Sequence, residues 1–313
     1  IDTVIHFAAI THVDESYTDR IGTIQENVIA TTTLLLLEAI NFYGRVRRLV
    51  HISTDEVYGE VYGDSMDDTT PKCEDSPLNP TNPYAASKAA CEVIVRSYHH
   101  HSYKLPYVMV RMNNVYGPRQ AYSKNNVYGP RQAYSKLIPK FTRLALEGKP
   151  YPLMGDGMHS RSWMYVDDCA EAIRRITERG RIGQTYNIGT EFEKCNLHLT
   201  EMLQEKVQKL MDRLHLTEML QEKVQKLMDR DPSQISFEPD PSQISFEPIA
   251  DRPYHDRRYY INFTKIREEL GWENFTKIRE ELGWECTVPF AQGLADTLDY
   301  YVKEYRKTHN AML

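Results

Sequence analysis

A buried strand that ends in a run of polar residues constrains this chain more than any other feature of its sequence. Residues 46–52 have the pattern of a strand inside a sheet, and residues 53–59 follow directly, with Thr54, Asp55 and Glu56 at their centre. In open α/β sheets, ligands bind beyond the carboxyl ends of the strands. The sequence therefore predicts an α/β fold with a candidate site at these three residues.

A second motif follows about one helix length downstream. Residues 79–83 read Asn-Pro-Thr-Asn-Pro, a turn and helix-start signal, and an apolar periodic segment then runs from Tyr84 to Tyr98. Tyr84 and Lys88 therefore share one face of the predicted helix. An ammonium near a phenol lowers the pKa of the phenol, which suits Tyr84 to general-base work near neutral pH. Tyr-x-x-x-Lys alone is more often an ordinary helix surface, so its weight comes from the strand-end motif.

Together, these motifs resemble the extended short-chain dehydrogenase/reductase family, and the Thr-Asp-Glu triplet resembles the nucleotide-sugar 4,6-dehydratases within it. Further segments carry the resemblance nearly from end to end, namely residues 6–14, 114–118, 161–168, 186–189 and 251–256. The resemblance implies a partial Rossmann fold, a doubly wound parallel sheet whose first βαβ units are missing, with a smaller C-terminal α/β lobe. Residues 1–150 are expected to hold the rest of the NAD-binding domain, and residues 151–313 mainly the substrate-binding lobe, interleaved with the first.

The resemblance implies a hydro-lyase that uses NAD to turn a nucleotide-diphosphate sugar into its 4-keto-6-deoxy form. Tyr84, supported by Lys88 and Thr54, is expected to take the C4 hydroxyl proton while NAD accepts the hydride. Glu56 then removes the C5 proton, and Asp55 protonates the departing C6 hydroxyl. Adjacent carboxylates suit this division, because like charges raise the pKa of one of them. The alternative is that the pair lies on a solvated turn, which the presence of Tyr84 and Lys88 disfavours.

The same resemblance assigns binding residues by position. The cofactor-binding residues are Phe7, Ala8, Ala9, Thr11, Asn27, Tyr84 and Lys88. The substrate-binding residues are Thr11, Asn114, Lys136, Leu137, Arg161, Asn187, Arg252 and His255. Small residues at positions 8 and 9 let a backbone pass close to a cofactor. Arginine forks suit phosphate oxygens, although a single arginine is more often a surface charge.

Composition excludes several other classes of protein. The 313 residues carry a net charge of −6 with a pI of about 6.0, which argues against nucleic-acid or anionic-membrane partners. No apolar run approaches membrane-spanning length. Five scattered cysteines without a Cys-x-x-Cys pair favour a reduced, cytoplasmic protein over a disulfide framework or a metal site. A homodimer is expected only because members of the resembled family commonly form one.

The sequence contains no glycine-rich dinucleotide fingerprint. Neither Gly-x-Gly-x-x-Gly nor Gly-x-x-Gly-x-x-Gly occurs, and residues 1–7 resemble the fourth strand of a Rossmann sheet. An N-terminal truncation is therefore expected, with weak or no NAD binding by these residues alone. The expected substrate is dTDP-glucose, with UDP-glucose as the alternative. Outside the enzymes, the alternative is an inactive nucleotide-sugar-binding or scaffold protein.

Four blocks of sequence are repeated in tandem without a change. Residues 113–124 recur as 125–136, 197–213 as 214–230, 231–239 as 240–248, and 262–273 as 274–285. Their unequal lengths exclude a solenoid and favour an artefact of assembly. Since a helix turns about 100° per residue, the second copy of the longest block starts about 260° out of register, so one continuous helix cannot bury both apolar stripes. Asn114 and Lys136 adjoin a strand and a helix, and are preferred over Asn126 and Lys124.

Overall fold

The computed structural model describes residues 1–32, 37–60, 70–100, 103–117, 136–228, 246–252, 254–272 and 290–310, without side chains at 38, 213–228, 291 and 304–310. The chain divides into two compact units. Unit 1 comprises Ile1–Val115, His159–Lys194 and Asp251–Thr287, and unit 2 comprises Tyr116–Met158, Cys195–Ala250 and Val288–Leu313. This division differs from the boundary expected at residue 150, because the chain returns to unit 1 at His159 to add further strands there.

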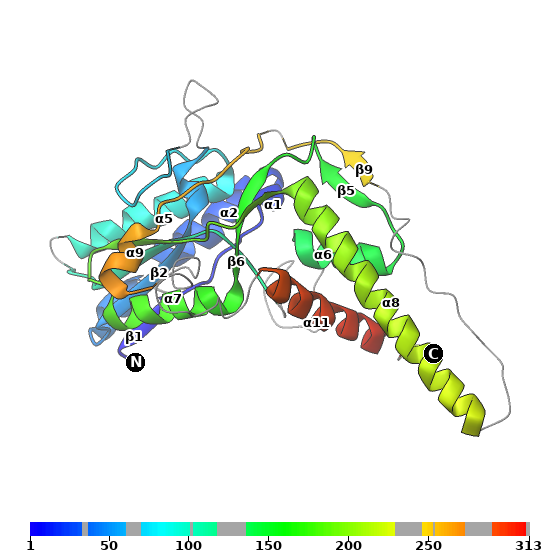
Figure 1. The fold of residues 1–313 in the computed structure, drawn as a ribbon. Helices are drawn as coiled ribbons and strands as arrows, with labels where there is room; N and C mark the ends of the chain where they lie inside the picture. Colours follow the sequence, from blue (N-terminus) through cyan, green and yellow to red (C-terminus); the bar gives the residue numbers. More distant parts are fainter. Residues whose placement is uncertain are drawn as a thin grey trace. The chain divides into compact units, whose positions relative to one another are not determined.

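A parallel sheet of four strands forms the centre of unit 1, in the order β1-β2-β3-β7 (Figure 1). The strands are β1 (Thr3–His6), β2 (Arg48–Thr54), β3 (Tyr107–Met112) and β7 (Thr185–Ile188). His6 pairs with His51, and Thr54 pairs with Met112, so the carboxyl ends of neighbouring strands share one edge. The predicted α/β fold with a parallel sheet is therefore confirmed, and Thr54 is the last residue of its strand.

Apolar side chains cover both faces of this sheet, as in other parallel sheets. On one face, Leu49 and Met109 pack with Val95 of α5 (Pro83–His99). On the other face, Val50 and Val108 pack in a cluster that includes the buried residues of α7 (Val166–Arg179) and α9 (Thr264–Leu270). The helix expected to begin at Tyr84 thus lies directly against the strand that carries the polar triplet.

The apolar periodicity of residues 27–40 predicts a single helix there, but the segment between β1 and β2 is divided into several short helices. It consists of α1 (Val13–Thr18), α2 (Arg20–Ile24), the π-helical turn η1 (Gln25–Ile29), α3 (Ala30–Thr32) and α4 (Leu37–Tyr43). A π turn widens the helix locally and is often found at functional sites. Here it carries Asn27, whose buried side chain bonds to a neighbouring loop and to α5.

A second sheet has the order β4-β6-β8. Its strands are β4 (Asn114–Tyr116), β6 (Ser160–Tyr165) and β8 (Glu193–Cys195). Helix α7 begins at Val166, directly after β6, as predicted from the sequence. β6 carries Arg161 among mostly buried neighbours, so this arginine is held on a strand rather than on a mobile surface loop.

Three helices and a strand pair make up the described part of unit 2. They are α6 (Leu137–Leu146), α8 (Asn196–Met228), α11 (Phe290–Asn310) and the parallel strands β5 (Tyr151–Met154) and β9 (Phe246–Ile249). Helix α8 is continuous through the tandem repeat, and its second half extends away from α6 in Figure 1. In the first copy, Leu199, Leu203, Val207 and Met211 are buried. The sequence predicts a stripe of Leu199, Leu203, Val207 and Leu210. The prediction is wrong only at the last residue, because Met211 and not Leu210 continues the four-residue spacing.

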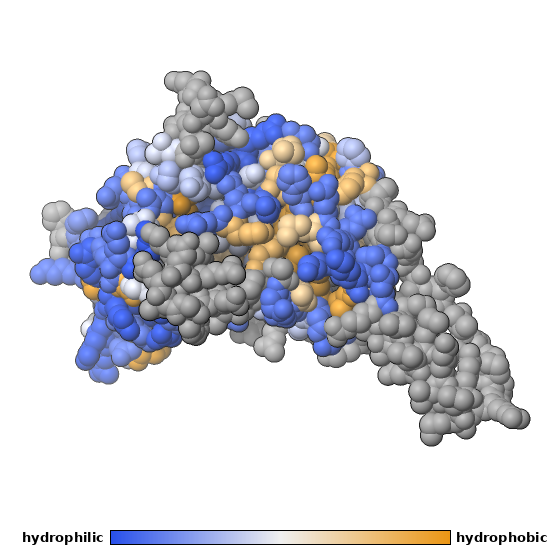
Figure 2. Space-filling view, in the orientation of Figure 1, coloured by the Kyte–Doolittle hydropathy of each residue, from blue (hydrophilic) through white to orange (hydrophobic). Residues whose placement is uncertain are grey.

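Among the described residues, no helix combines the length and the apolar character that crossing a membrane requires. Hydrophilic residues cover much of the coloured surface in Figure 2, with apolar patches between them.

Candidate functional site

Asp55 lies at the carboxyl end of β2, where the strand turns into the short 3₁₀ helix η2 (Asp55–Tyr58). Thr54 caps this helix: its Oγ1 accepts a hydrogen bond from the Glu56 amide (3.3 Å) and donates one to Asp55 Oδ1 (3.1 Å). Asn113, the residue after β3, donates its Nδ2 hydrogen to Asp55 Oδ2 (2.7 Å). Two adjacent strand ends therefore fix both carboxyl oxygens of Asp55.

The Asp55 carboxyl is 2% exposed, and this burial raises its pKa to about 7. The charge of Glu56 is the second cause of the rise, while the Asn113 hydrogen bond, the Arg161 charge and the Thr54 hydrogen bond act against it. The expectation that one carboxyl of the pair has a raised pKa agrees with this result, although burial and not the neighbouring charge is the larger cause. Asp55 can therefore carry a proton near neutral pH.

Glu56 has a different environment from its neighbour. It is only partly buried, and its Oε2 accepts hydrogen bonds from Asn82 Nδ2 (3.0 Å) and from the Tyr259 hydroxyl (3.3 Å). Asn82 also caps α5, since its Oδ1 accepts a hydrogen bond from the Ala85 amide (2.8 Å). The same asparagine therefore positions both the start of α5 and the Glu56 carboxylate.

Tyr84 and Lys88 are both buried on α5, one turn apart. The pKa of Tyr84 lies above its ordinary value, because burial opposes the phenolate and the charge of Glu56 adds to this, while a hydrogen bond with Thr54 acts the other way. This direction is opposite to the lowering expected from Lys88. Desolvation outweighs the lysine in the protein alone, so formation of the phenolate requires further positive charge near Tyr84.

The Lys88 ammonium has an unusual position for a charged group. It is 4% exposed, and burial lowers its pKa against the opposing charges of Cys91 and Glu92. No hydrogen bond or ion pair joins it to any residue in the described part of the chain. Burial also lowers the pKa of His6 to about 4, and the Lys88 charge adds to this effect.

The structure thus places Asp55 and Glu56 at the carboxyl end of a parallel strand, beside the helix with Tyr84 and Lys88. This is the arrangement expected from the resemblance to the nucleotide-sugar dehydratases. The profile of the GDP-mannose 4,6-dehydratase family matches residues 1–276. The chain belongs to this family.

Three relatives show how much of a family member this chain spans. It is 37% identical over 304 residues to the trifunctional UDP-glucose 4,6-dehydratase/UDP-4-keto-6-deoxy-D-glucose 3,5-epimerase/UDP-4-keto-L-rhamnose-reductase of Arabidopsis thaliana, covering 97% of this chain but 36% of that protein. It is 35% identical over 309 residues to a dTDP-glucose 4,6-dehydratase of Xanthomonas campestris pv. campestris, covering 96% of this chain and 72% of that protein. The crystal structure of a dTDP-glucose 4,6-dehydratase from Streptomyces venezuelae with NAD bound is 33% identical, with a TM-score of 0.73, and covers 98% of this chain and 75% of that one.

The residues assigned to the cofactor lie in three places: the segment after β1, the π turn η1 and helix α5. Phe7, Ala8 and Thr11 are exposed in the segment after β1, and Phe7 is 54% exposed. Asn27 is buried, donates to the Ile10 carbonyl (3.0 Å) and to Ser87 Oγ (2.9 Å), and accepts from the Ile10 amide (2.7 Å). The Asn27 amide is thus engaged within the protein, which favours a positioning role for it over direct contact.

Arg161 and its surroundings link the site to the loop after β9. The guanidinium donates to the carbonyls of Ser160 (2.7 Å) and Asp256 (2.9 Å), and lies 4.5 Å from the centre of the Tyr259 ring. Its charge also acts on Asp55. Arg161 therefore holds the loop that presents Tyr259 to Glu56.

Arg252 and His255 flank the same loop. Arg252 Nε donates to Asp14 Oδ1 (2.5 Å), and His255 Nδ1 lies 2.6 Å from Asp251 Oδ1. Burial lowers the pKa of His255 to about 4, and the charge of Arg252 adds to this. His255 is therefore neutral at pH 7, and can bind a phosphate by hydrogen bonding but not as a cation.

Asn187 is a predicted substrate residue whose side chain is engaged within the protein. It is fully buried, accepts from the Tyr58 hydroxyl (2.7 Å), and donates to the carbonyls of Lys72 (3.2 Å) and Asn262 (2.9 Å). These three bonds favour a positioning role for the Asn187 amide, and its role in substrate binding stays a prediction.

The remaining predicted substrate residues lie in different units. Asn114 begins β4 in unit 1, whereas Lys136 and Leu137 lie at the start of α6 in unit 2. Their role in binding stays a prediction. The alternative copies Asn126 and Lys124 lie outside the described residues.

Sequence reasoning missed four polar residues that complete the site. They are Asn82, Asn113, Asp256 and Tyr259. Asp256 Oδ2 accepts hydrogen bonds from Thr81 Oγ1 (2.5 Å) and from the Tyr259 hydroxyl. Asn113 could have been found, because residues 107–111 have the pattern of a strand that ends close to it, but the resemblance assigned its neighbour Asn114.

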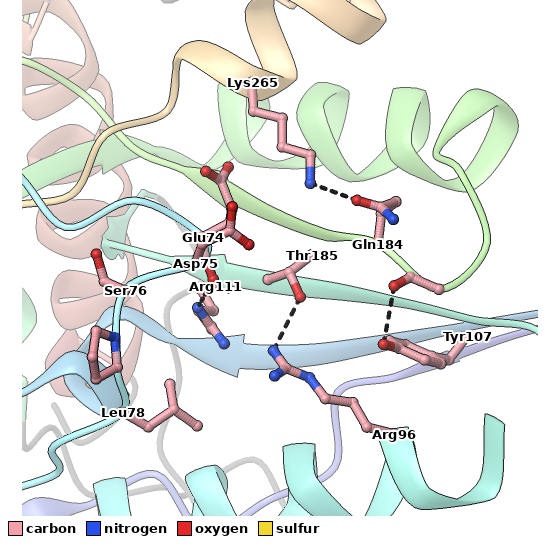
Figure 3. Close-up of a pocket in the computed structure, with 12 residues that line it drawn as sticks. Glu74, Asp75, Ser76, Leu78, Arg96, Tyr107, Arg111, Gln184, Thr185 and Lys265 are labelled. Atoms are coloured by element: carbon pink, nitrogen blue, oxygen red, sulfur yellow. Dashed lines mark hydrogen bonds between the residues drawn. The ribbon is translucent and has the colours of Figure 1, made fainter. Parts of the chain in front are cut away.

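A pocket of about 420 Å³ lies elsewhere in unit 1 and contains none of the predicted site residues (Figure 3). It is lined by Glu74–Leu78, Arg96, Tyr107, Arg111, Gly183–Thr185 and Lys265. In Figure 3, Arg96 points to Thr185 (3.3 Å) and Lys265 points to Gln184 (2.9 Å). The cations of this pocket already have partners within the protein, so the pocket supports no separate function.

Proposed function

We propose that this chain acts as an NAD-dependent dTDP-glucose 4,6-dehydratase. The observation that carries the proposal is that Asp55 is buried whereas Glu56 is partly exposed. Elimination of water needs an acid and a base that act at neighbouring carbons of the sugar, and these two environments suit those two roles. Relatives that act on dTDP-glucose and UDP-glucose have similar identities to this chain. The dTDP-glucose substrate is proposed because several similar proteins, among them the Xanthomonas relative and the Streptomyces venezuelae structure, are dTDP-glucose 4,6-dehydratases.

Tyr84 begins the reaction by accepting the proton of the C4 hydroxyl as the C4 hydrogen leaves as hydride. NAD, when bound, supplies the hydride acceptor and a positively charged nicotinamide ring. Because burial raises the pKa of Tyr84, its phenolate needs both that charge and the ammonium of Lys88. Thr54, which hydrogen-bonds Tyr84, supports the phenol in this step.

The carboxyl pair then carries out the elimination. Once C4 is a ketone, the C5 proton is acidic, and Glu56, held by Asn82 and Tyr259, removes it. Asp55, protonated near neutral pH, donates its proton to the C6 hydroxyl, which leaves as water. Asn113 donates to Asp55 Oδ2 and so holds the carboxyl group in one orientation during this transfer.

The Lys88 ammonium supports the fit of the nicotinamide half of NAD. A buried ammonium without a hydrogen-bond partner is unfavourable, and ribose hydroxyls at this position would supply the missing acceptors. Residues 7–11, at the carboxyl end of the neighbouring strand β1, would then face the same ring. Tyr84 and Lys88 are thus the residues of this chain that hold the reacting half of the cofactor.

The substrate diphosphate is assigned to Arg252 and His255 in unit 1, with Thr11, Asn114 and Arg161 of the same unit as further candidates. Arg252 is the strongest of these, because only its Nε is engaged by Asp14 and its fork suits phosphate oxygens. Arg161 contributes through its charge and through the loop it holds.

A labelled substrate tests the reaction. Protein expressed from its gene is incubated with NAD and dTDP-glucose carrying deuterium at C4, and the product is measured by mass spectrometry. The expected product is lighter by one water and keeps the deuterium, which moves from C4 to C6. A product of unchanged mass would indicate epimerisation, and absence of turnover would favour the scaffold alternative. Faster turnover of UDP-glucose in a parallel assay would show that UDP-glucose, and not dTDP-glucose, is the preferred substrate.

A homodimer in the cytoplasm completes the proposal. Cys73, Cys91, Cys169 and Cys195 are free thiols, which supports a reducing compartment. Sedimentation over a hundredfold range of protein concentration tests the dimer, and a monomer throughout that range would contradict it.

A further inference from the structure

Three side chains that suit a transition-metal ion meet in unit 1, apart from the catalytic carboxyl pair. They are His159, Asp251 and His255, and one ligand atom of each lies within 4.8 Å of the other two. Nothing in the sequence spacing indicated this group, because His159 lies far along the chain from the other two residues. Within the described ranges, it is the one cluster of three such side chains.

The Asp251 carboxylate joins the two imidazoles. Its Oδ2 lies 3.4 Å from His159 Nε2, and its Oδ1 lies 2.6 Å from His255 Nδ1. The imidazole rings stack with their centroids 3.6 Å apart and their planes 13° from parallel. Two nitrogens and two carboxylate oxygens therefore converge on one small volume.

Burial makes this a built site. His159 is 3% exposed and the His255 side chain 7%, whereas the Asp251 side chain is 34% exposed and leaves one side open. Around tetrahedral zinc, with bonds of about 2.0–2.1 Å, neighbouring ligand atoms lie about 3.3 Å apart. The two nitrogen–oxygen distances here, 3.4 Å and 2.6 Å, lie on either side of that separation. Rotation of one stacked ring would therefore let all three side chains reach one ion.

We propose that His159, Asp251 and His255 bind a first-row transition-metal dication such as Zn²⁺, with a fourth coordination position open to solvent. Two imidazoles and one carboxylate form a donor set of the kind that holds zinc with an exchangeable ligand. The imidazoles disfavour Mg²⁺ and Ca²⁺, which prefer oxygen ligands.

Neighbouring charges set the expected strength of the site. The Arg252 amide donates to Asp251 Oδ1 (2.8 Å) and orients the carboxylate. The charges of Arg252 and Arg161 reach His255 and oppose a bound cation. We therefore expect weaker binding than at a closed structural zinc site, and we expect an anion in the fourth position to strengthen it.

Calorimetric titration with Zn²⁺ tests the proposal, with Co²⁺ as a spectroscopic probe. The purified protein should bind one Zn²⁺ or Co²⁺ ion, and the Co²⁺ form should show the intense visible absorption of four-coordinate Co²⁺. Excess Mg²⁺ should not weaken this binding. His255→Gln and Asp251→Asn should each weaken binding by about tenfold or more. His198→Gln, at an exposed histidine, is the matched control and should leave the affinity unchanged.

Two results would overturn the site. One is Zn²⁺ binding of equal affinity in the protein, His255→Gln and Asp251→Asn, which would place the ion elsewhere. The other is a weak, six-coordinate Co²⁺ spectrum in the unaltered protein. This second measurement decides the matter even if a variant fails to fold, since it needs no substitution at the site.

Discussion

Replacing Asp55 by asparagine tests the environment on which the proposed acid chemistry depends. Asn has nearly the shape of a protonated carboxyl group and still offers an oxygen to Asn113, but it does not ionise. The native protein must hold a buried Asp55 charge at high pH, whereas the unfolded chain holds that charge in water. Asp55→Asn should therefore stabilise the fold at pH 8 and have little effect at pH 4.

The expected magnitude follows from the two pKa values. Burial raises the pKa of Asp55 from 3.8 to about 7. Because the folded pKa is the higher one, the associated stability is fully present below about pH 4 and is lost as the pH rises to about 7. At about 1.4 kcal/mol per unit, the loss over about three units amounts to about 4 kcal/mol. Asp55→Asn should not show this loss in the free energy of unfolding, because asparagine does not ionise.

Urea unfolding of the protein and of Asp55→Asn at pH 4, 5, 6, 7 and 8 measures the difference directly. The gap between their free energies of unfolding should open by about 1.4 kcal/mol per unit and level off above about pH 7. Asp75→Asn, at an exposed carboxyl group of unit 1, is the control and should show a small, constant gap. A gap for Asp55→Asn that stays constant across this range would refute the raised pKa and, with it, Asp55 as the proton donor.

Three further predictions concern the catalytic division, the core and the repeats. Given substrate and NAD, Glu56→Gln should still transfer hydride and accumulate reduced cofactor, with turnover lowered by about 10²–10⁴-fold. Tyr84→Phe should form no reduced cofactor. If both variants lose hydride transfer equally while substrate affinity is unchanged, Glu56 is not the C5 base. Glu92→Gln breaks the buried ion pair with Arg111 (2.7 Å) and should cost about 3–5 kcal/mol in urea unfolding, against about 0–1 kcal/mol for Glu178→Gln at an exposed pair. If the tandem repeats are artefacts, protein from the native gene should have an intact mass lower by the duplicated blocks, and a mass that includes them would contradict this.

Sequence periodicity predicted the regular elements of the fold well. The sequence pattern predicts a helix over residues 137–146 and a strand over residues 185–188, and the structure has both with these bounds. The segment expected as one helix over residues 27–40 is instead broken, because Asn27 bonds to Ile10 and Ser87 and a π turn forms around it. Such a break depends on tertiary partners that no local pattern contains.

The division into two units was harder to foresee than the sheet. A boundary near residue 150 treats the chain as two consecutive parts, but β6 and β7 return to unit 1 after the chain has entered unit 2. Strand order depends on which strands pair, and pairing is a long-range property. The motifs marked strand ends without showing which of those ends are neighbours.

The proposed acid–base pair shows most clearly why adjacency in sequence is a weak guide to chemistry. Asp55 and Glu56 are consecutive, so sequence reasoning could give each carboxyl a role only by resemblance. In the 3₁₀ helix η2, successive side chains point about 120° apart, and the two carboxyl groups therefore meet different partners. Asp55 is buried against Asn113 of the next strand end, and Glu56 is partly exposed between Asn82 and Tyr259.

These partners come from segments 26 to 203 residues away from the pair. Burial raises the pKa of Asp55 more than the charge of Glu56 does. An acid and a base can thus stand side by side because the turn sends one carboxyl inward and the other toward solvent. Within this family, a Thr-Asp-Glu triplet would support elimination only where a strand end and a 3₁₀ turn divide the pair in this way.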